Sequence, residues 1–144
     1  MCIGNGIKLI DILLLALEET LIIGTESFFK SGSPVHHFAV VFEDNTETGY
    51  FYAVDLINGL HILDALHIYN VEDVVDGQKP GKVQIWWNDA GNIASLLINS
   101  YFHAIIDFSR HAGYCRNAFP PANDKWSWDT NRILTDELIK EIFE

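Results

Sequence analysis

Short strand-like runs separated by polar turns constrain the fold of this chain more than any other feature of its sequence. Residues 35–43 (VHHFAVVFE) and 50–56 (YFYAVDL) flank a polar turn at 44–49. Aromatic and β-branched residues favour strands, so this pair of runs predicts a β-hairpin. Residues 83–88 and 93–99 flank a four-residue loop and predict a second hairpin, which residues 101–109 extend by a further strand. The pattern predicts an antiparallel meander.

The strand at 101–109 carries different side chains on its two faces. Side chains alternate along a strand, so two sets are expected to point in opposite directions. One set is apolar and the other is mixed: Phe102, Ala104, Ile106 and Phe108, against Tyr101, His103, Ile105 and Asp107. This pattern predicts a half-buried strand with one wet or functional face.

Two helices are expected at the ends of the chain. Residues 7–19 are apolar, and on a helix their four charged side chains fall on one narrow stripe, which predicts a helix buried in the core or against a second copy. A homodimer through residues 7–17 is therefore one expectation. The uninterrupted apolar run at 12–17 is too short to span a bilayer, and no basic flank indicates a signal peptide. At the other end, Thr135 is a good N-cap for a helix over 136–143.

The fold class that these elements predict is α+β. We expect a single domain over residues 1–144, with about five or six meander strands in a sheet core at 35–109. The N-terminal apolar helix at 7–19 and the short C-terminal helix at 136–143 should pack on one side of the sheet. Residues 113–128 read as an irregular, Pro-rich loop. Residues 60–75 are ambiguous and favour a short helical turn that leads into a strand.

The charge of the chain limits its partners. The net charge is −11. It argues against binding to nucleic acid or to an anionic membrane surface, because proteins bind both of these through the positive charges of Lys and Arg. Residues 31–78 contain eight Asp and Glu and no Lys or Arg. This stretch is either a solubilising face or a surface that steers a basic protein partner.

Two consecutive tryptophans add a possible anchor to the acidic surface. On a strand, Trp86 and Trp87 must face opposite ways, so one lies in the core and the other is an interface anchor or covers the underside of a helix. The binding residues that the sequence predicts are Glu43, Asp44, Glu47, Asp55, Glu72, Asp73, Trp86 and Trp87.

An enzymatic alternative rests on histidine and aspartate. If residues 65–71 are extended, His67 could share a sheet face with His103 and Asp107. A histidine near a carboxylate is the minimum set of side chains needed for general acid–base catalysis. A structural His–Asp hydrogen bond explains the same residues. Cys115 beside Arg116 is a weaker nucleophile candidate, and a packed loop cysteine is the favoured interpretation.

No metal and no cofactor are predicted. The six histidines lack the spacings typical of zinc ligands, and the common nucleotide, hydrolase and zincin motifs are absent from the sequence. Two cysteines make no disulfide framework, so a reducing compartment, the cytoplasm, is expected.

Several blocks of the sequence resemble a family of small bacterial proteins classed as a domain of unknown function. They are FEDNTETGYFYAVD (42–55), ILDALHIYNV (62–71), LLIN (96–99), HAIIDF (103–108) and GYCRNAFP (113–120). The resemblance implies a bacterial, cytoplasmic origin and supplies no catalytic residues. The function that we expect is a non-enzymatic, acidic protein-binding domain, such as an immunity-type protein that neutralises a basic toxin or enzyme. The alternative is a small enzyme or ligand-binding domain with a His/Asp pocket on a sheet face.

Overall fold

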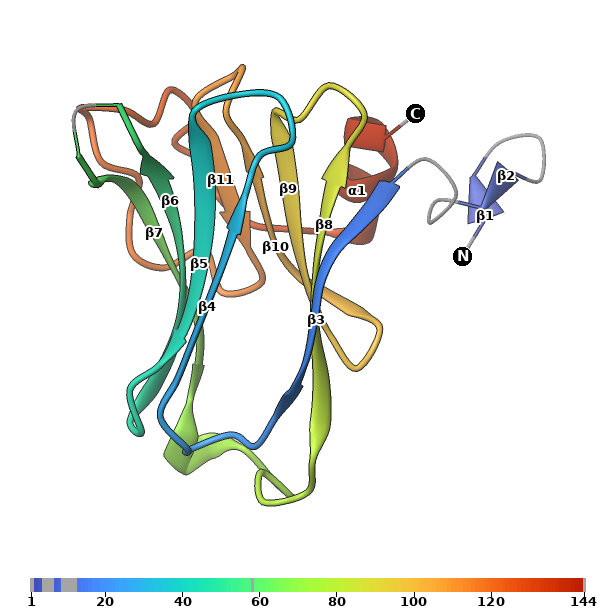
Figure 1. Cartoon of the computed structure of the whole chain (residues 1–144), viewed down its shortest axis with the longest axis vertical. Helices are drawn as coiled ribbons and strands as arrows, with labels where there is room; N and C mark the ends of the chain where they lie inside the picture. The colour runs from blue at the N-terminus through green and yellow to red at the C-terminus, as the bar shows by residue number, and fades with distance from the viewer. Residues whose placement is uncertain (1, 4–6, 9–12, 58, 144) are drawn as a thin grey trace.

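Two β-sheets packed face to face form the body of the protein (Figure 1). The computed structural model describes residues 2–3, 7–8, 13–57 and 59–143. The five-stranded sheet has the order β11-β10-β9-β8-β3, and the four-stranded sheet has the order β4-β5-β6-β7. Neighbouring strands within both sheets are antiparallel.

The elements of the two sheets follow one another along the chain with few crossovers. The five-stranded sheet contains β3 (Leu13–Leu21), β8 (Gly81–Asn88), β9 (Ile93–Ile98), β10 (Tyr101–Asp107) and β11 (Ala112–Cys115). The four-stranded sheet contains β4 (Ser27–Gly32), β5 (Phe38–Asp44), β6 (Thr48–Asp55) and β7 (His61–Asn70). A 3-10 turn, η2 (Val71–Asp73), follows β7, and the helix α1 spans Asp136–Phe143. A separate antiparallel pair is formed by β1 (Cys2–Ile3) and β2 (Ile7–Lys8).

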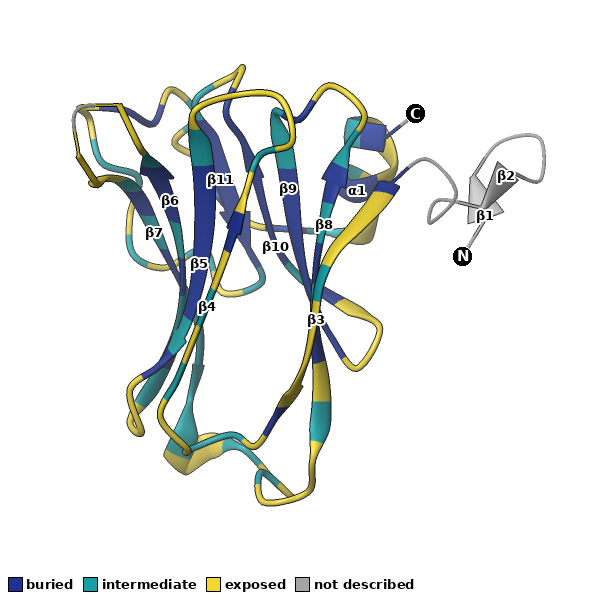
Figure 2. Cartoon of the chain, viewed as in Figure 1, coloured by how far each residue is buried: buried dark blue, intermediate teal, exposed yellow. Residues whose placement is uncertain are grey.

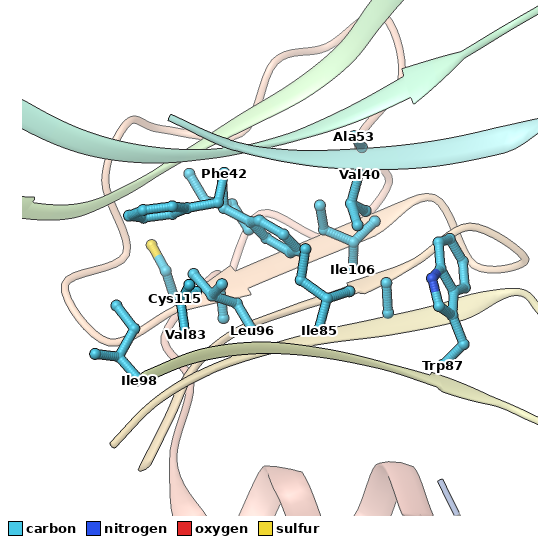
Figure 3. Close-up of a cluster of buried hydrophobic side chains, with 14 of the residues drawn as sticks. Val40, Phe42, Ala53, Val83, Ile85, Trp87, Leu96, Ile98, Ile106 and Cys115 are labelled. Atoms are coloured by element: carbon cyan, nitrogen blue, oxygen red, sulfur yellow. The ribbon is translucent and has the colours of Figure 1, made fainter. Parts of the chain in front are cut away.

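The main hydrophobic core lies between the two sheets (Figure 3). Val40 and Phe42 of β5 point towards Ile85 and Trp87 of β8, and all four are fully buried. Alternation explains this arrangement, because every second residue of these strands faces inwards. Burial of one such side chain contributes about 1.5–3 kcal/mol.

A second core lies on the outer face of the five-stranded sheet. There Ile139 and Phe143 of α1 pack against a cluster that includes Phe102 and Ile105 of β10. A register shift between Phe102 and Ala104 explains why residues three apart share a face. The helix therefore covers the five-stranded sheet, and no helix of the described residues lies over the outer side of the four-stranded sheet (Figure 1).

A buried ion pair joins the two sheets along one side. A guanidinium nitrogen of Arg132 lies 2.9 Å from Asp64 Oδ1 of β7, and both side chains are almost fully buried. Residues next to Arg132 form a parallel bridge with β11, between Cys115 and Ile133. A Cβ on Gly113 of β11 would lie 2.5 Å from Asp64 Oδ2, so only glycine allows this close approach.

The predicted N-terminal helix is wrong. Residues 13–21 form strand β3, which pairs with β8 and contains a bulge between Leu15 and Leu17. Leucines and glutamates favour helix, but pairing with the strongly strand-forming residues 83–88 outweighs that preference. Leu14 and Leu15 are exposed on this strand, so the apolar stripe does not mark a buried helix. Residues 9–12 lie outside the described residues.

The α+β fold class is also wrong, because the described residues form a two-sheet β-rich fold with one helix. The prediction of a single meander sheet is wrong as well, because the strands are divided between two sheets. Strand β4, which had not been predicted, is the first strand of the four-stranded sheet. Residues 61–70 are extended throughout, so strand replaces the helical turn that was expected at the start of this region. The region 113–128 is not wholly irregular, since Ala112–Cys115 pairs with β10. The helix at 136–143 is confirmed, and its cap is formed by Thr135 Oγ1, which accepts a hydrogen bond from Leu138 N at 3.1 Å.

Candidate functional site

The outer face of the four-stranded sheet carries a row of large side chains that crosses all four strands. Cross-strand partners lie on the same face of a sheet. The register pairs Phe28 with Glu43, Glu43 with Tyr50, and Tyr50 with His67. Their chain neighbours Phe29, Phe42, Phe51 and Leu66 face the core. These four side chains, Phe28, Glu43, Tyr50 and His67, are called the outer-face row below.

Further aromatic rings extend the outer-face row. The ring of Tyr52 stacks on Tyr50 at 5.9 Å between centroids, and His67 meets Tyr50 edge to face at 5.4 Å. Phe119, which is 52% exposed, lies 6.0 Å from His67. Phe28, at the other end of the row, is 60% exposed. In the part of the chain that the structure describes, no helix and no further sheet lies over this face (Figure 1).

Glu43 places a carboxylate among these rings. It is half-buried, with Phe28 on one side, Tyr50 on the other, and the Tyr52 hydroxyl 3.4 Å from its Oε1. Burial and the neighbouring Glu43 carboxylate raise the pKa of Tyr52, so its hydroxyl stays protonated near neutral pH. An acid flanked by aromatic faces can bind a Lys or Arg side chain, because the charge and the ring quadrupoles both attract a cation.

His67 is fixed by a loop that follows β11. Its Nδ1 lies 2.6 Å from Asn117 Nδ2, and its Nε2 lies 2.9 Å from Asn70 Oδ1. Its backbone N–H donates to the Phe119 carbonyl at 2.9 Å. The loop therefore holds both the imidazole ring and the outer edge strand β7 in place, which pre-organises this end of the outer-face row.

Asp44 does not face solvent as the predicted binding site requires. It is fully buried and accepts hydrogen bonds from Gly24 N–H at 2.8 Å, Thr46 N–H at 2.8 Å and Tyr69 Oη at 2.7 Å. Burial and the bond to Asp44 raise the pKa of Tyr69. The role of Asp44 is to hold the β5–β6 turn to the neighbouring chain segments.

The remaining predicted acidic residues do not form one patch. Glu47, Glu72 and Asp73 are exposed near each other, where Val71 N–H donates to the Glu47 carbonyl at 2.8 Å. Asp55 is the last residue of β6, whereas Glu47 immediately precedes the first residue of that strand. The two acids therefore lie at opposite ends of β6. Eight strand residues span about 26 Å. Of the predicted acids, only Glu43 belongs to the outer-face row.

The two tryptophans face opposite ways, as expected, but both lie on β8 of the five-stranded sheet, whereas Glu43 lies on the other sheet. Trp87 is fully buried, and its Nε1 donates to Ser31 Oγ at 3.0 Å. Trp86 is half-buried against the cluster under α1, and its Nε1 donates to Gln84 Oε1 at 3.2 Å. Trp86 therefore covers the helix-bearing side of the five-stranded sheet, away from the outer-face row.

His67, His103 and Asp107 do not form the predicted pocket, because His67 belongs to the other sheet. Asp107 is buried, and its Oδ1 accepts hydrogen bonds from the N–H and hydroxyl of Ser109 and from Arg110 N–H. This carboxylate closes the β10–β11 turn. His103 lies beside Tyr101 and Arg116, where burial and the Arg116 charge lower its pKa to about 4.

Cys115 has the surroundings of a structural cysteine. It is fully buried, and desolvation raises the pKa of its thiol, which disfavours the reactive thiolate.

The ring of His111 is stacked against Trp126 and Trp128, and its Nδ1 lies 3.1 Å from the Trp126 carbonyl. Within the described ranges, no group of three or more His, Cys, Asp or Glu side chains is arranged to hold a metal ion.

The sequence alone did not reveal Phe28, Tyr50, Tyr52 and Phe119 as site residues. The aromatic alternation of residues 50–52 was visible, but the partner strand β4 (SFFKSG) is short and follows a turn-rich segment. Without β4, the neighbour of Glu43 across the sheet could not be assigned. The register of the β5–β6 hairpin was the one available signal that Glu43 and Tyr50 lie side by side.

The fold and the outer-face row define a two-sheet β-rich domain with an exposed aromatic face, and comparison with known proteins places it in a family. The chain belongs to the family described as "Uncharacterized protein conserved in bacteria (DUF2251)", whose model matches residues 21–143. The resemblance expected from the sequence blocks is confirmed, and the match extends beyond those blocks at both ends.

A protein from Haemophilus influenzae, described as "Uncharacterized protein", is similar to this chain. The two are 43% identical over 125 residues, which cover 85% of this chain and 78% of the relative. No solved structure matches the chain. Among the described residues, no helix has the length and apolar character needed to cross a membrane.

Proposed function

We propose that this protein is a non-enzymatic binding domain that recognises a basic segment of a partner protein through the outer-face row. The observation that carries the proposal is the position of Glu43, a half-buried carboxylate between Phe28 and Tyr50 on a sheet face that no helix or further sheet of the described residues covers. A Lys or Arg side chain placed there would pair with the carboxylate while its methylene groups lie on the rings.

The charge of the whole chain supports the same kind of partner. A net charge of −11 accelerates association with a basic protein and disfavours acidic partners. The exposed acids outside the outer-face row, among them Glu47, Glu72 and Asp73, would act on the encounter rate. A basic toxin or enzyme of the same bacterium is the partner class that we propose, with this chain in an immunity-type role.

The test begins with capture of partners from lysate of the native bacterium, released by a salt gradient and identified by mass spectrometry. Binding kinetics of the purified partner are then measured for Glu43→Gln and for the control Glu19→Gln, an exposed acid on β3. We expect Glu43→Gln to weaken binding about tenfold or more, with most of the change in dissociation, because a contact charge is lost. Glu19→Gln should alter mainly the association rate.

Equal effects of the two substitutions would contradict the proposal, because the acids would then act only through net charge. A partner whose association rate is the same at low and high salt would contradict it as well. Folding of each variant is checked by circular dichroism before the kinetics are interpreted.

A further inference from the structure

The four-stranded sheet has one covered edge and one open edge. At the β7 edge, three alternate residues are bonded by other segments: Leu63 O accepts from Asn123 Nδ2, Ala65 O accepts from Arg132, and His67 N–H donates to Phe119 O. The β4 edge has β5 as its single neighbour in the sheet. Within the described part of the chain, no hydrogen bond outside the β4–β5 ladder reaches the backbone of residues 28–32.

The β4 edge has fewer of the features that protect an edge strand than the β3 edge has, because its register is unbroken and it carries a single charge, Lys30. The other strand next to β4 in the chain, β3, is an edge with a bulge at Leu15–Leu17 and carries Glu18 and Glu19. Bulges and charges discourage pairing with another chain. In contrast, Ser27–Gly32 pairs with β5 in an unbroken register, and Lys30 is its one charged residue.

We propose that an extended, basic segment of a partner protein binds by adding a fifth strand to the β4 edge. This inference rests on the proposed function and names its binding mode. The residue of the added strand that pairs with Phe28 would extend the outer-face row by one position, because the row already runs from Phe28 to Glu43 across the strands. Strands lie about 4.8 Å apart, so an Arg at that position can cross the Phe28 ring towards Glu43.

Charge selects both the occupant and its register. Two copies of this chain would each bring a net charge of −11 to the interface, which disfavours pairing of β4 with β4. Lys30 lies on the same face as Phe28, two residues further along β4. A second basic residue placed opposite Lys30 would be repelled, so the segment needs its cation opposite Phe28 and a neutral or acidic residue opposite Lys30.

The experiment uses a fluorescent peptide of about eight residues, alternating Thr and Val around one central Arg, so that it is extended and carries one cation. Fluorescence anisotropy reports its affinity for the full chain. Two further peptides carry N-methyl groups on alternate residues, one set for each edge of the peptide. We expect one of these two sets to weaken binding at least tenfold and the other to have little effect, because a single peptide edge donates to β4.

Side-chain variants test the register. Phe28→Ala and Glu43→Gln should each weaken the parent peptide several-fold, whereas Val75→Ala, an exposed apolar control in the segment after η2, should not. Replacing the peptide Arg by Glu should abolish binding. A peptide with Arg moved by two positions, opposite Lys30, should bind less tightly than the parent.

Three outcomes would overturn strand addition. The first is that both N-methylated peptides bind as tightly as the parent peptide. If Glu43→Gln still weakens binding in that case, the partner binds through the side-chain face alone, and the proposed function is retained. Another is that no peptide binds, while the captured partner remains sensitive to Glu43→Gln. The last is that light scattering shows a concentration-dependent dimer of this chain and that Phe28→Ala dissociates the dimer. In that case a second copy of the chain, and not a partner segment, occupies the β4 edge.

Discussion

Asp64 and Arg132 show at the residue scale how a buried charge holds the two sheets together. We expect Asp64→Asn to lower the free energy of unfolding by about 3–5 kcal/mol, because it leaves the Arg132 charge buried without its carboxylate partner. Urea unfolding measures the loss. The control is Asp136→Asn, which breaks the exposed ion pair with Arg116 and should cost less than about 1 kcal/mol. Similar losses in the two variants would show that burial of the pair is unimportant.

His103 gives the protein a predicted pH dependence. Its folded-state pKa is lowered to about 4 from the ordinary value of 6.5, first by burial and then by the Arg116 charge. The unfolded chain therefore binds more protons between these pH values, and stability falls as the pH drops from 6.5 towards 4. The loss is on the order of 2 kcal/mol. Unfolding measured across this pH range should show a smaller decline for His103→Gln; an identical decline would contradict this assignment.

At the scale of single elements, the cap of α1 can be tested apart from its packing. Thr135→Ala removes the hydroxyl that accepts the Leu138 N–H and should lower the free energy of unfolding by about 1 kcal/mol. Thr135→Ser keeps the hydroxyl and should restore most of the loss. If the alanine and serine variants are equally stable, the side-chain cap contributes nothing measurable.

The same elements show what the sequence could and could not predict. The hairpins at β5–β6 and β8–β9 were predictable because apolar alternation and turn residues are local signals. Strand β3 was mistaken for a helix because its leucines and glutamates favour helix locally, while the pairing with β8 that decides its structure joins residues far apart in the chain. The bulge at Phe102–Ala104 places Phe102 and Ile105 on the same face of β10, although strict alternation predicts opposite faces. The sequence contains no local signal from which this bulge could be predicted.

The candidate site was only partly predictable for the same reason. Glu43 was expected at the end of a strand and Asp44 in the turn after it, but both lie on β5, where Glu43 is on the outer face and Asp44 points the other way and is buried. Treating both as surface acids ignored the strand alternation. The proximity of Phe28 to Glu43 depends on β4, and the proximity of Phe119 to His67 depends on a loop, so neither could be derived from spacing.

At the scale of the whole molecule, the two sheet faces have different surroundings. The five-stranded sheet is covered on its outer side by α1, and the residues between β11 and α1 complete its edge. The four-stranded sheet has the aromatic outer-face row and the β4 edge, and much of β4 is coloured as exposed in Figure 2. The two sheets therefore differ in how much of their outer faces the rest of the described chain covers.

The ion pair between the sheets also sets an order of events during synthesis on the ribosome. Asp64 lies on β7, but its partner Arg132 is 68 residues later in the chain. Until those residues have emerged from the exit tunnel, the hairpins that contain β5 to β7 can form, yet packing Asp64 against β11 would bury a charge without a counterion. The nascent chain therefore has a physical reason to delay closure of its two sheets until Arg132 is available.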